Sequence, residues 1–119
     1  MPLKPEQILQ INLINWFKHE WPELSLDIHH FANERKCSDY EGKILQKMGV
    51  TRGVSDIFLG FALNGFHGLW IELKSDRGKL SDEQMEFIKR KNQRGYFAVA
   101  VWGLEATKEV IKCYLKDYK

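Results

Sequence analysis

The stretch GVSDIFLGFALNGFHGLWIELK, residues 53–74, contains two apolar runs joined by the dipeptide Asn64-Gly65. Each run has the length and composition of a buried strand, and Asn-Gly favours the tight turn of a hairpin. The stretch therefore predicts two antiparallel strands, around which the other elements can be placed.

A helix, a strand and a short helix are predicted before the hairpin. A helix begins at Pro5 and continues to about residue 19, because its apolar residues recur at helical spacing. LSLDIHHFA, residues 24–32, alternates like a strand, with one side formed by Leu24, Leu26, Ile28 and His30. A polar segment from residue 33 then leads to a short helix that ends at Gly49.

A helix, a strand and a second helix are predicted after the hairpin. Ser81 and Gln84 have the S-x-x-Q spacing of a capping box, which predicts a helix from residue 81 to about residue 94. YFAVAVW, residues 96–102, is a buried strand, and the helical crossover makes it parallel to the strand ending at Lys74. The last segment is an amphipathic helix. The expected fold class is α/β, a mixed β-sheet flanked by helices.

Length and composition limit the class of protein. Residues 1–119 are expected to form a single domain, because 44% of them are hydrophobic and the chain is too short for two cores. A formal net charge of +2 does not single out nucleic acid, a membrane or an acidic partner. Two cysteines without CxxC spacing favour reduced thiols in the cytoplasm. Without a signal peptide or a membrane-length apolar run, we expect neither secretion nor a membrane association.

Asp56, Glu72 and Lys74 are predicted to meet within the hairpin. Glu72 and Lys74 are two residues apart on one strand, so they point to the same face. Asp56 begins the neighbouring antiparallel strand. A strict two-residue turn with a regular ladder would place Asp56 opposite Leu73, on the other face. We therefore predict an extra residue or a bulge near one of the hairpin glycines.

Two carboxylates in a partly buried place repel each other unless a cation neutralises them. Mg²⁺ or Mn²⁺ suits this role because hard divalent cations prefer oxygen ligands. The candidate ligands are Asp56, Glu72 and the backbone carbonyl of Leu73. Lys74 would orient or help deprotonate a water and offset charge on a phosphate. The grouping suits metal-assisted hydrolysis of a phosphodiester.

Each candidate also has a purely structural interpretation. A strand-borne Glu-x-Lys pair is more often a solvated ion pair of little energetic value. An Asp at the start of a strand is commonly a turn residue. The capping box explains Gln84, and the dipole of the first helix explains Glu6.

Taken together, the segments GVSDIFLGF, LWIELKSDRGKLSDEQ and NQRGYFAVAVW resemble the VRR-NUC family (virus-type replication-repair nucleases) of the PD-(D/E)xK nuclease superfamily. The shared pattern is Gly-x-x-Asp, Glu-x-Lys, a Gly-Lys-Leu-Ser loop, a helix-borne Gln and a Gly before the last strand. The likeness extends back through HHFANERK. It implies a restriction-endonuclease-like core of order α-β-β-β-α-β, here with an added C-terminal helix.

The resemblance implies divalent-metal-dependent cleavage of DNA, with catalytic roles for Asp56, Glu72, Lys74 and Gln84 and with Glu6 as an acid near the metal. Ser55 stands where the family usually has Pro, which would stiffen the approach to the acid. Small family members resemble Holliday-junction resolvases in size, which implies a homodimer acting on branched DNA such as four-way junctions. Such an enzyme needs no organic cofactor and acts where the cell holds DNA.

DNA contacts are expected from local clusters near the proposed site, because the net charge is small. The candidates are Asn33, Arg35, Lys36, Arg52, Arg77 and Lys79. Ordinary surface solubility is the alternative for each basic residue. Two alternative functions are a catalytically silent nuclease fold that binds DNA or supports assembly, and a sequence-specific duplex endonuclease. The latter would need a target-recognition domain, for which a chain of this length has little room.

Overall fold

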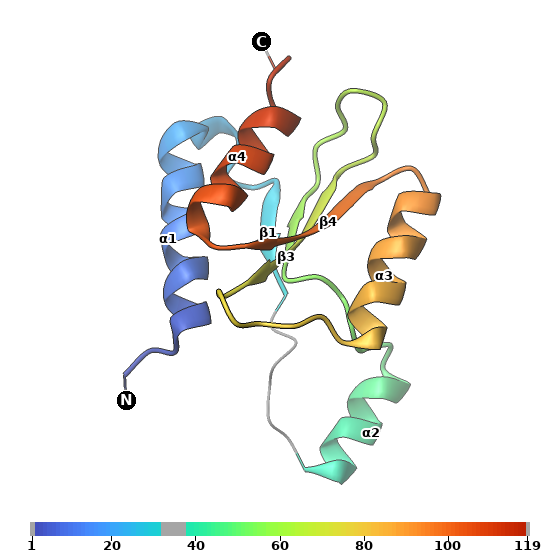
Figure 1. The fold of residues 1–119 in the computed structure, drawn as a ribbon. Coiled ribbons are helices and arrows are strands. Elements are labelled where there is room, and N and C mark those ends of the chain that lie inside the picture. Colours follow the sequence, from blue (N-terminus) through green and yellow to red (C-terminus); the bar gives the residue numbers. More distant parts are fainter. Residues whose placement is uncertain (1, 32–37, 119) are drawn as a thin grey trace.

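The computed structural model describes residues 2–31 and 38–118, and their elements follow the predicted order (Figure 1). The helices are α1 (Pro5–Glu20), α2 (Asp39–Lys47), α3 (Asp82–Gln93) and α4 (Leu104–Tyr114), with a short 3₁₀ helix η1 (Pro22–Leu24) after α1. The strands are β1 (Ile28–His30), β2 (Ile57–Leu59), β3 (Leu69–Lys74) and β4 (Phe97–Trp102).

The four strands form one mixed sheet in the order β1-β2-β3-β4. The first three are antiparallel neighbours, whereas β4 runs parallel to β3, as its helical crossover predicts. Helices α1 and α4 cover one face of the sheet, and α3 covers the other (Figure 1). The predicted α/β class, a mixed sheet flanked by helices, is confirmed.

The two faces of the sheet differ in chemistry because successive strand residues point to opposite sides. The face toward α1 and α4 forms the apolar core, where the fully buried strand residues are Ile57, Leu59, Leu69, Ile71 and Leu73. Leu13 and Phe17 of α1 and Ile111 of α4 close this core. The polar residues Glu72 and Lys74 therefore project from the face that α3 covers.

An aromatic cluster anchors α3 to that second face. Trp70 stacks on Phe58 with ring centroids 4.3 Å apart, and the centroid of the Phe87 ring lies 5.0 Å from that of Trp70 in an edge-on arrangement. The ammonium of Lys91 lies 5.4 Å from the centroid of the same Trp70 ring, which adds a cation–π attraction from α3. These contacts fix the distance of α3 from β3, and hence the place of the first turn of α3.

The hairpin tip has the predicted Asn64-Gly65 turn. Leu63 pairs with Phe66 across it, and both turn residues have positive φ, 56° for Asn64 and 84° for Gly65. Asn and Gly are the residues that adopt this conformation at the lowest cost. The side chain of Asn64 also donates to the carbonyl of Tyr114 over 3.1 Å, which ties the tip to α4.

The predicted irregularity lies between this turn and the main ladder. Residues 60–62 on one strand oppose only residues 67 and 68 on the other, since Leu59 pairs with Leu69. The extra residue shifts the register by one position. One residue beyond the pair of Ile57 and Ile71, this register puts Asp56 opposite Glu72 instead of Leu73. The prediction of a bulge is therefore confirmed.

The first predicted strand, residues 24–32, is wrong in its first half. Pro22 begins η1, and the N–H of Asp27 donates to the carbonyl of Leu24, so the chain turns before β1 begins at Ile28. Leu24 is buried within η1, whereas Leu26, assigned to the same side, is 89% exposed. His30, assigned to that side as well, is exposed.

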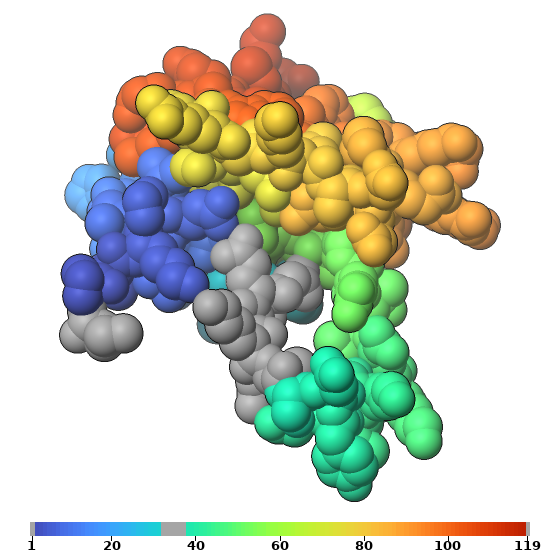
Figure 2. All heavy atoms as spheres, turned by 60° about the horizontal axis from the view of Figure 1, so that its bottom comes forward, coloured from blue at the N-terminus to red at the C-terminus, as the bar shows by residue number. Residues whose placement is uncertain are grey.

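Helix α2 confirms the short predicted helix and projects from the body of the domain (Figure 2). A capping box of Ser38 and Glu41 begins it, and Gly49, with φ of +101°, follows its end. Within residues 2–31 and 38–118, every helix is too short or too polar to span a membrane.

Candidate active site

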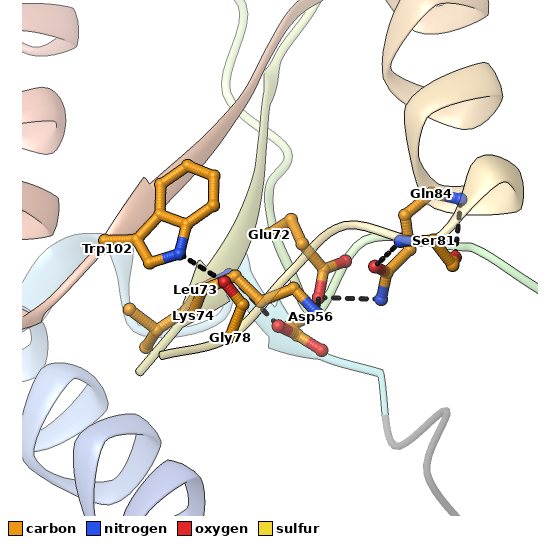
Figure 3. Close-up of polar contacts among 8 residues, drawn as sticks. All are labelled: Asp56, Glu72, Leu73, Lys74, Gly78, Ser81, Gln84 and Trp102. Carbon is orange, nitrogen blue, oxygen red and sulfur yellow. Dashed lines mark hydrogen bonds and ion pairs between the residues drawn. The ribbon is translucent and has the colours of Figure 1, made fainter. Parts of the chain in front are cut away.

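The candidate site lies where the start of β2, the end of β3 and the first turn of α3 meet (Figure 3). Asp56 directly precedes β2, Glu72 and Lys74 belong to β3, and Gln84 lies in the first turn of α3. Four residues from three segments of the chain thus gather on one face of the sheet.

The ionisable members of this group are buried. Asp56 is 4% exposed, Glu72 is 1% exposed and Lys74 is 7% exposed. A solvated surface ion pair keeps its charged groups in water, so this interpretation of Glu72 and Lys74 is excluded. Burying two acids and one ammonium costs several kcal/mol per ion before any pairing, in order of magnitude.

Asp56 accepts hydrogen bonds from the main chain of β3 and from the residue that follows β1. Its Oδ2 accepts from the N–H of Leu73 over 3.0 Å, and its carbonyl accepts from the N–H of Phe31 over 2.6 Å. Ser55 is completely buried, and its hydroxyl has no hydrogen-bond partner among the described residues. Packing and main-chain bonds therefore fix the approach to Asp56 without a proline at position 55.

One carboxylate oxygen of Glu72, Oε2, contacts both Lys74 and Gln84. This oxygen lies 3.7 Å from Nζ of Lys74 and accepts a hydrogen bond of 3.2 Å from Nε2 of Gln84 (Figure 3). A cation and an amide donor both favour the ionised carboxylate. The two contacts also fix the direction of the Glu72 side chain.

Gln84 serves the helix cap and the site at the same time. Its Oε1 accepts from the N–H of Ser81 over 2.9 Å, while its own N–H donates to Oγ of Ser81 over 3.1 Å. The predicted capping box is thus confirmed. The opposite end of the same amide, Nε2, reaches Glu72. The two explanations of Gln84 do not compete, because an amide presents an acceptor and donors on separate atoms.

The remaining predicted site residues lie in α1, in loops, or outside the described residues. Glu6 is half-buried in the first turn of α1, and its role near the site stays a prediction. Arg52, Arg77 and Lys79 are exposed and lie in loops that adjoin site residues in the sequence. Arg52 borders a groove of about 620 Å³ along α3, where Arg90 pairs with Glu86 and holds the pKa of Glu86 below its usual range. The predicted DNA contacts Asn33, Arg35 and Lys36 lie outside the described residues.

Two residues that support the site were not named as site residues from the sequence, although Gly53 is the glycine of the Gly-x-x-Asp pattern. Trp102, at the end of β4, donates through Nε1 to the carbonyl of Gly78 over 2.7 Å. Gly53 packs against the start of α3 so closely that a methyl group there would lie 2.5 Å from the carbonyl oxygen of Glu83. The pairing of Lys74 with Trp102, which follows from a parallel β3–β4 ladder, is the signal that would have identified Trp102.

The chemistry of the donors suits a hard divalent cation. Continuing the β2–β3 register by one residue puts Asp56 and Glu72 at facing positions, each with a carboxylate to offer, and the Leu73 carbonyl stays the predicted third ligand. Within the described residues, no three side chains of the Asp, Glu, His and Cys types gather into a metal cluster. Mg²⁺ needs no such cage, because it keeps several waters and binds proteins through one or two carboxylates.

Comparison with known proteins identifies the family of the chain. The VRR-NUC domain family matches residues 3–103 of the chain. A solved structure described as a VRR-NUC domain protein is 28% identical, with a TM-score of 0.83, and the match covers 98% of this chain and 92% of that chain. No curated protein matches the chain. The chain belongs to the VRR-NUC family and carries a nuclease domain of the PD-(D/E)xK type.

Proposed function

We propose that the chain is a Mg²⁺- or Mn²⁺-dependent endonuclease that hydrolyses phosphodiester bonds in DNA. The observation that supports this most directly is the burial of Asp56, Glu72 and Lys74 on one face of the sheet, beside the amide of Gln84. Burying two acids, an ammonium and an amide donor together is costly compared with an apolar core.

Each residue has a separate task in the proposed reaction. Asp56, Glu72 and the carbonyl of Leu73 would hold the cation, which when bound activates water and stabilises charge on the phosphate. Lys74 would orient the attacking water and offset the negative charge that develops on the phosphate oxygens. Gln84 would keep the carboxylate of Glu72 in its orientation. Glu6 would add an acid from α1.

DNA would reach the site along the loop between β3 and α3. Arg77 and Lys79 in this loop and Arg52 before β2 are exposed, and long basic side chains in loops suit contacts with phosphates. We include Asn33, Arg35 and Lys36 in the proposed surface because they precede the central helix in the sequence.

A branched substrate and a homodimer are the finer part of the proposal. Two copies related by a twofold axis would present two sites to two strands of a four-way junction. The mass of the protein in solution tests the dimer by itself, and the mass of one chain would contradict it.

The proposed function predicts DNA cleavage that depends on a divalent cation. The purified protein is incubated with a four-way junction, a flap, a single strand and a linear duplex in Mg²⁺, in Mn²⁺ and in EDTA. We expect cleavage in either metal and none in EDTA, with the junction cut fastest. Absence of cleavage of every substrate in both metals would overturn the proposal, and fastest cleavage of the linear duplex would remove only the preference for branched DNA.

A silent nuclease fold that only binds DNA is the second candidate. Ca²⁺ separates the two, because it occupies oxygen sites but supports hydrolysis poorly. The enzyme is expected to bind DNA in Ca²⁺ without cutting it and to bind more weakly in EDTA. A module without a metal site would bind equally well in both.

A further inference from the structure

We propose that Trp102 is a positioning residue of the active site, which holds the loop after β3 against Lys74. This inference rests on the proposed nuclease function, because the groups that it positions are those that would act on DNA. The hydrogen bond of the indole goes to the loop, so Trp102 would act on the reaction through the loop and Lys74.

Trp102 projects from the face of the sheet that carries the site. It pairs with Lys74 in the parallel ladder of β3 and β4, and paired residues of neighbouring strands point to the same face. The ring lies close to the loop that follows Lys74 (Figure 3). Its Nε1–H donates to the carbonyl of Gly78 over 2.7 Å, across 24 residues of sequence. An indole has only this one donor, and here it is used on the loop.

Gly78 is the point at which the loop meets Lys74. Its N–H donates to the carbonyl of Ser75 over 2.9 Å, which closes a tight turn. A methyl group on Gly78 would lie 3.1 Å from Cδ and 3.3 Å from Cβ of Lys74. The backbone of the loop therefore packs directly on the aliphatic part of the lysine side chain, and Trp102 fixes the residue that makes this contact.

The main chain of Lys74 is fixed from the same end of β4. The N–H of Gly103, which follows Trp102, donates to the carbonyl of Lys74 over 2.9 Å. Backbone and side chain of Lys74 are thus held by two adjacent residues, one directly and one through the loop. With the loop in place, Lys74 is 7% exposed and its Nζ stays 3.7 Å from Oε2 of Glu72.

The loop held by Trp102 also carries Arg77 and Lys79. In the space-filling view, the loop lies at the surface between α1 and α3 (Figure 2). One hydrogen bond from β4 would therefore affect both the position of Lys74 and the position of the two basic residues. Loss of this bond should lower the rate at saturating DNA through Lys74, and weaken DNA binding through Arg77 and Lys79.

Trp102→Phe tests the inference because it removes the N–H donor and keeps an aromatic ring. Trp16→Phe is the matched control, since Trp16 lies half-buried in α1 against Trp21, on the opposite side of the sheet. Both variants are compared with the wild type in Mn²⁺ and Mg²⁺, by the single-turnover cleavage rate at saturating DNA and by hydrogen exchange of the amides of residues 75–80.

For Trp102→Phe we expect a rate at saturating DNA lower by roughly tenfold, because a small displacement of an acting group is costly. Exchange at the Gly78 amide should become faster by about tenfold as the loop loosens. Trp16→Phe should match the wild type in both measurements. A general loss of stability would instead speed exchange throughout the molecule and leave the saturated rate of the folded protein unchanged.

A wild-type rate in Trp102→Phe beside an active wild-type protein would overturn the inference and leave the proposed function standing. A wild-type protein that cleaves no DNA would overturn the proposed function, and with it the role of Trp102. If Trp102→Phe does not fold, Gly78→Ala tests the contact from the loop side, because the added methyl group must displace the Lys74 side chain. Gly78→Ala is then expected to lower the saturated rate, and an unchanged rate would contradict the inference.

Discussion

At the scale of single residues, Gln84 shows what sequence and structure each contribute. The S-x-x-Q spacing predicted its role in the capping box, which is confirmed. The sequence left its second role open, because the direction of the amide depends on where α3 lies above β3. The structure places Nε2 at 3.2 Å from Oε2 of Glu72 while Oε1 caps the helix, so one side chain joins the helix start to the site.

The two uses of Gln84 can be separated by substitution. Gln84→Glu keeps an acceptor for the N–H of Ser81 but replaces the donor to Glu72 with a second negative charge. We expect cleavage to fall by roughly a hundredfold, in the range seen when a single positioned donor is lost. Ser81→Ala should instead cost about 1 kcal/mol of stability through the lost cap and retain cleavage. Cleavage rates and urea unfolding measure both effects.

A Gln84→Glu variant that cleaves DNA like the wild type would show that the contact with Glu72 has no part in the reaction. Loss of cleavage in Ser81→Ala of the same size as in Gln84→Glu would assign the effect to the helix cap alone.

At the scale of elements, local sequence patterns predicted the features that are determined by residues close together in the sequence. The hairpin turn and the helix after Ser81 were confirmed because each depends on residues close in sequence. The parallel last strand was confirmed because a helical crossover returns the chain in the same direction. The bulge was predicted as well, since the sheet offers only two faces and Asp56 suits only one of them. The strand predicted at residues 24–32 was wrong only in its first half, because an alternating pattern does not reveal that Pro22 starts a 3₁₀ helix.

A substitution of Gly53 tests the position of α3. Gly53 has φ of +85°, and a methyl group on it would collide with the backbone of Glu83 at the start of α3. Gly53→Ala should therefore displace the turn that carries Gln84, and lower both stability and cleavage. Gly49→Ala is the matched control, because Gly49 has φ of +101° and open space around it.

We expect Gly49→Ala to cost about 1–2 kcal/mol from backbone strain alone, with normal cleavage by the folded protein. Gly53→Ala should cost roughly 1–3 kcal/mol more, because close contact is added to the strain. Equal stability of the two variants in chemical unfolding would contradict the close packing of Gly53 on α3.

At the scale of the whole molecule, the apolar core and the candidate site lie on opposite faces of the sheet. The face toward α1 and α4 is an apolar core, whereas the face toward α3 holds the buried acids and the lysine. The α/β class and the family followed from the order of short motifs along the chain. The strand pairing would have placed Trp102 beside Lys74, but its hydrogen bond to Gly78 could not be predicted, because that bond joins residues 24 apart through a single side chain.

This separation predicts that the acids can be neutralised without loss of the fold. Asp56→Asn and Glu72→Gln keep the shape of each side chain, while the apolar core on the other face is untouched. The amide oxygen introduced by Asp56→Asn can still accept from the N–H of Leu73, as the carboxylate of Asp56 does. Glu109→Gln, an exposed acid on α4, is the matched control. Thermal unfolding should stay cooperative for all three variants.

The most direct measurement of the central claim is the cleavage of a four-way junction by these three variants in Mg²⁺ and in Mn²⁺. We expect no cleavage by Asp56→Asn or Glu72→Gln, because the proposed cation loses a charged ligand in each, and normal cleavage by Glu109→Gln. Wild-type cleavage by both folded site variants would contradict the assignment of Asp56 and Glu72 as the catalytic centre.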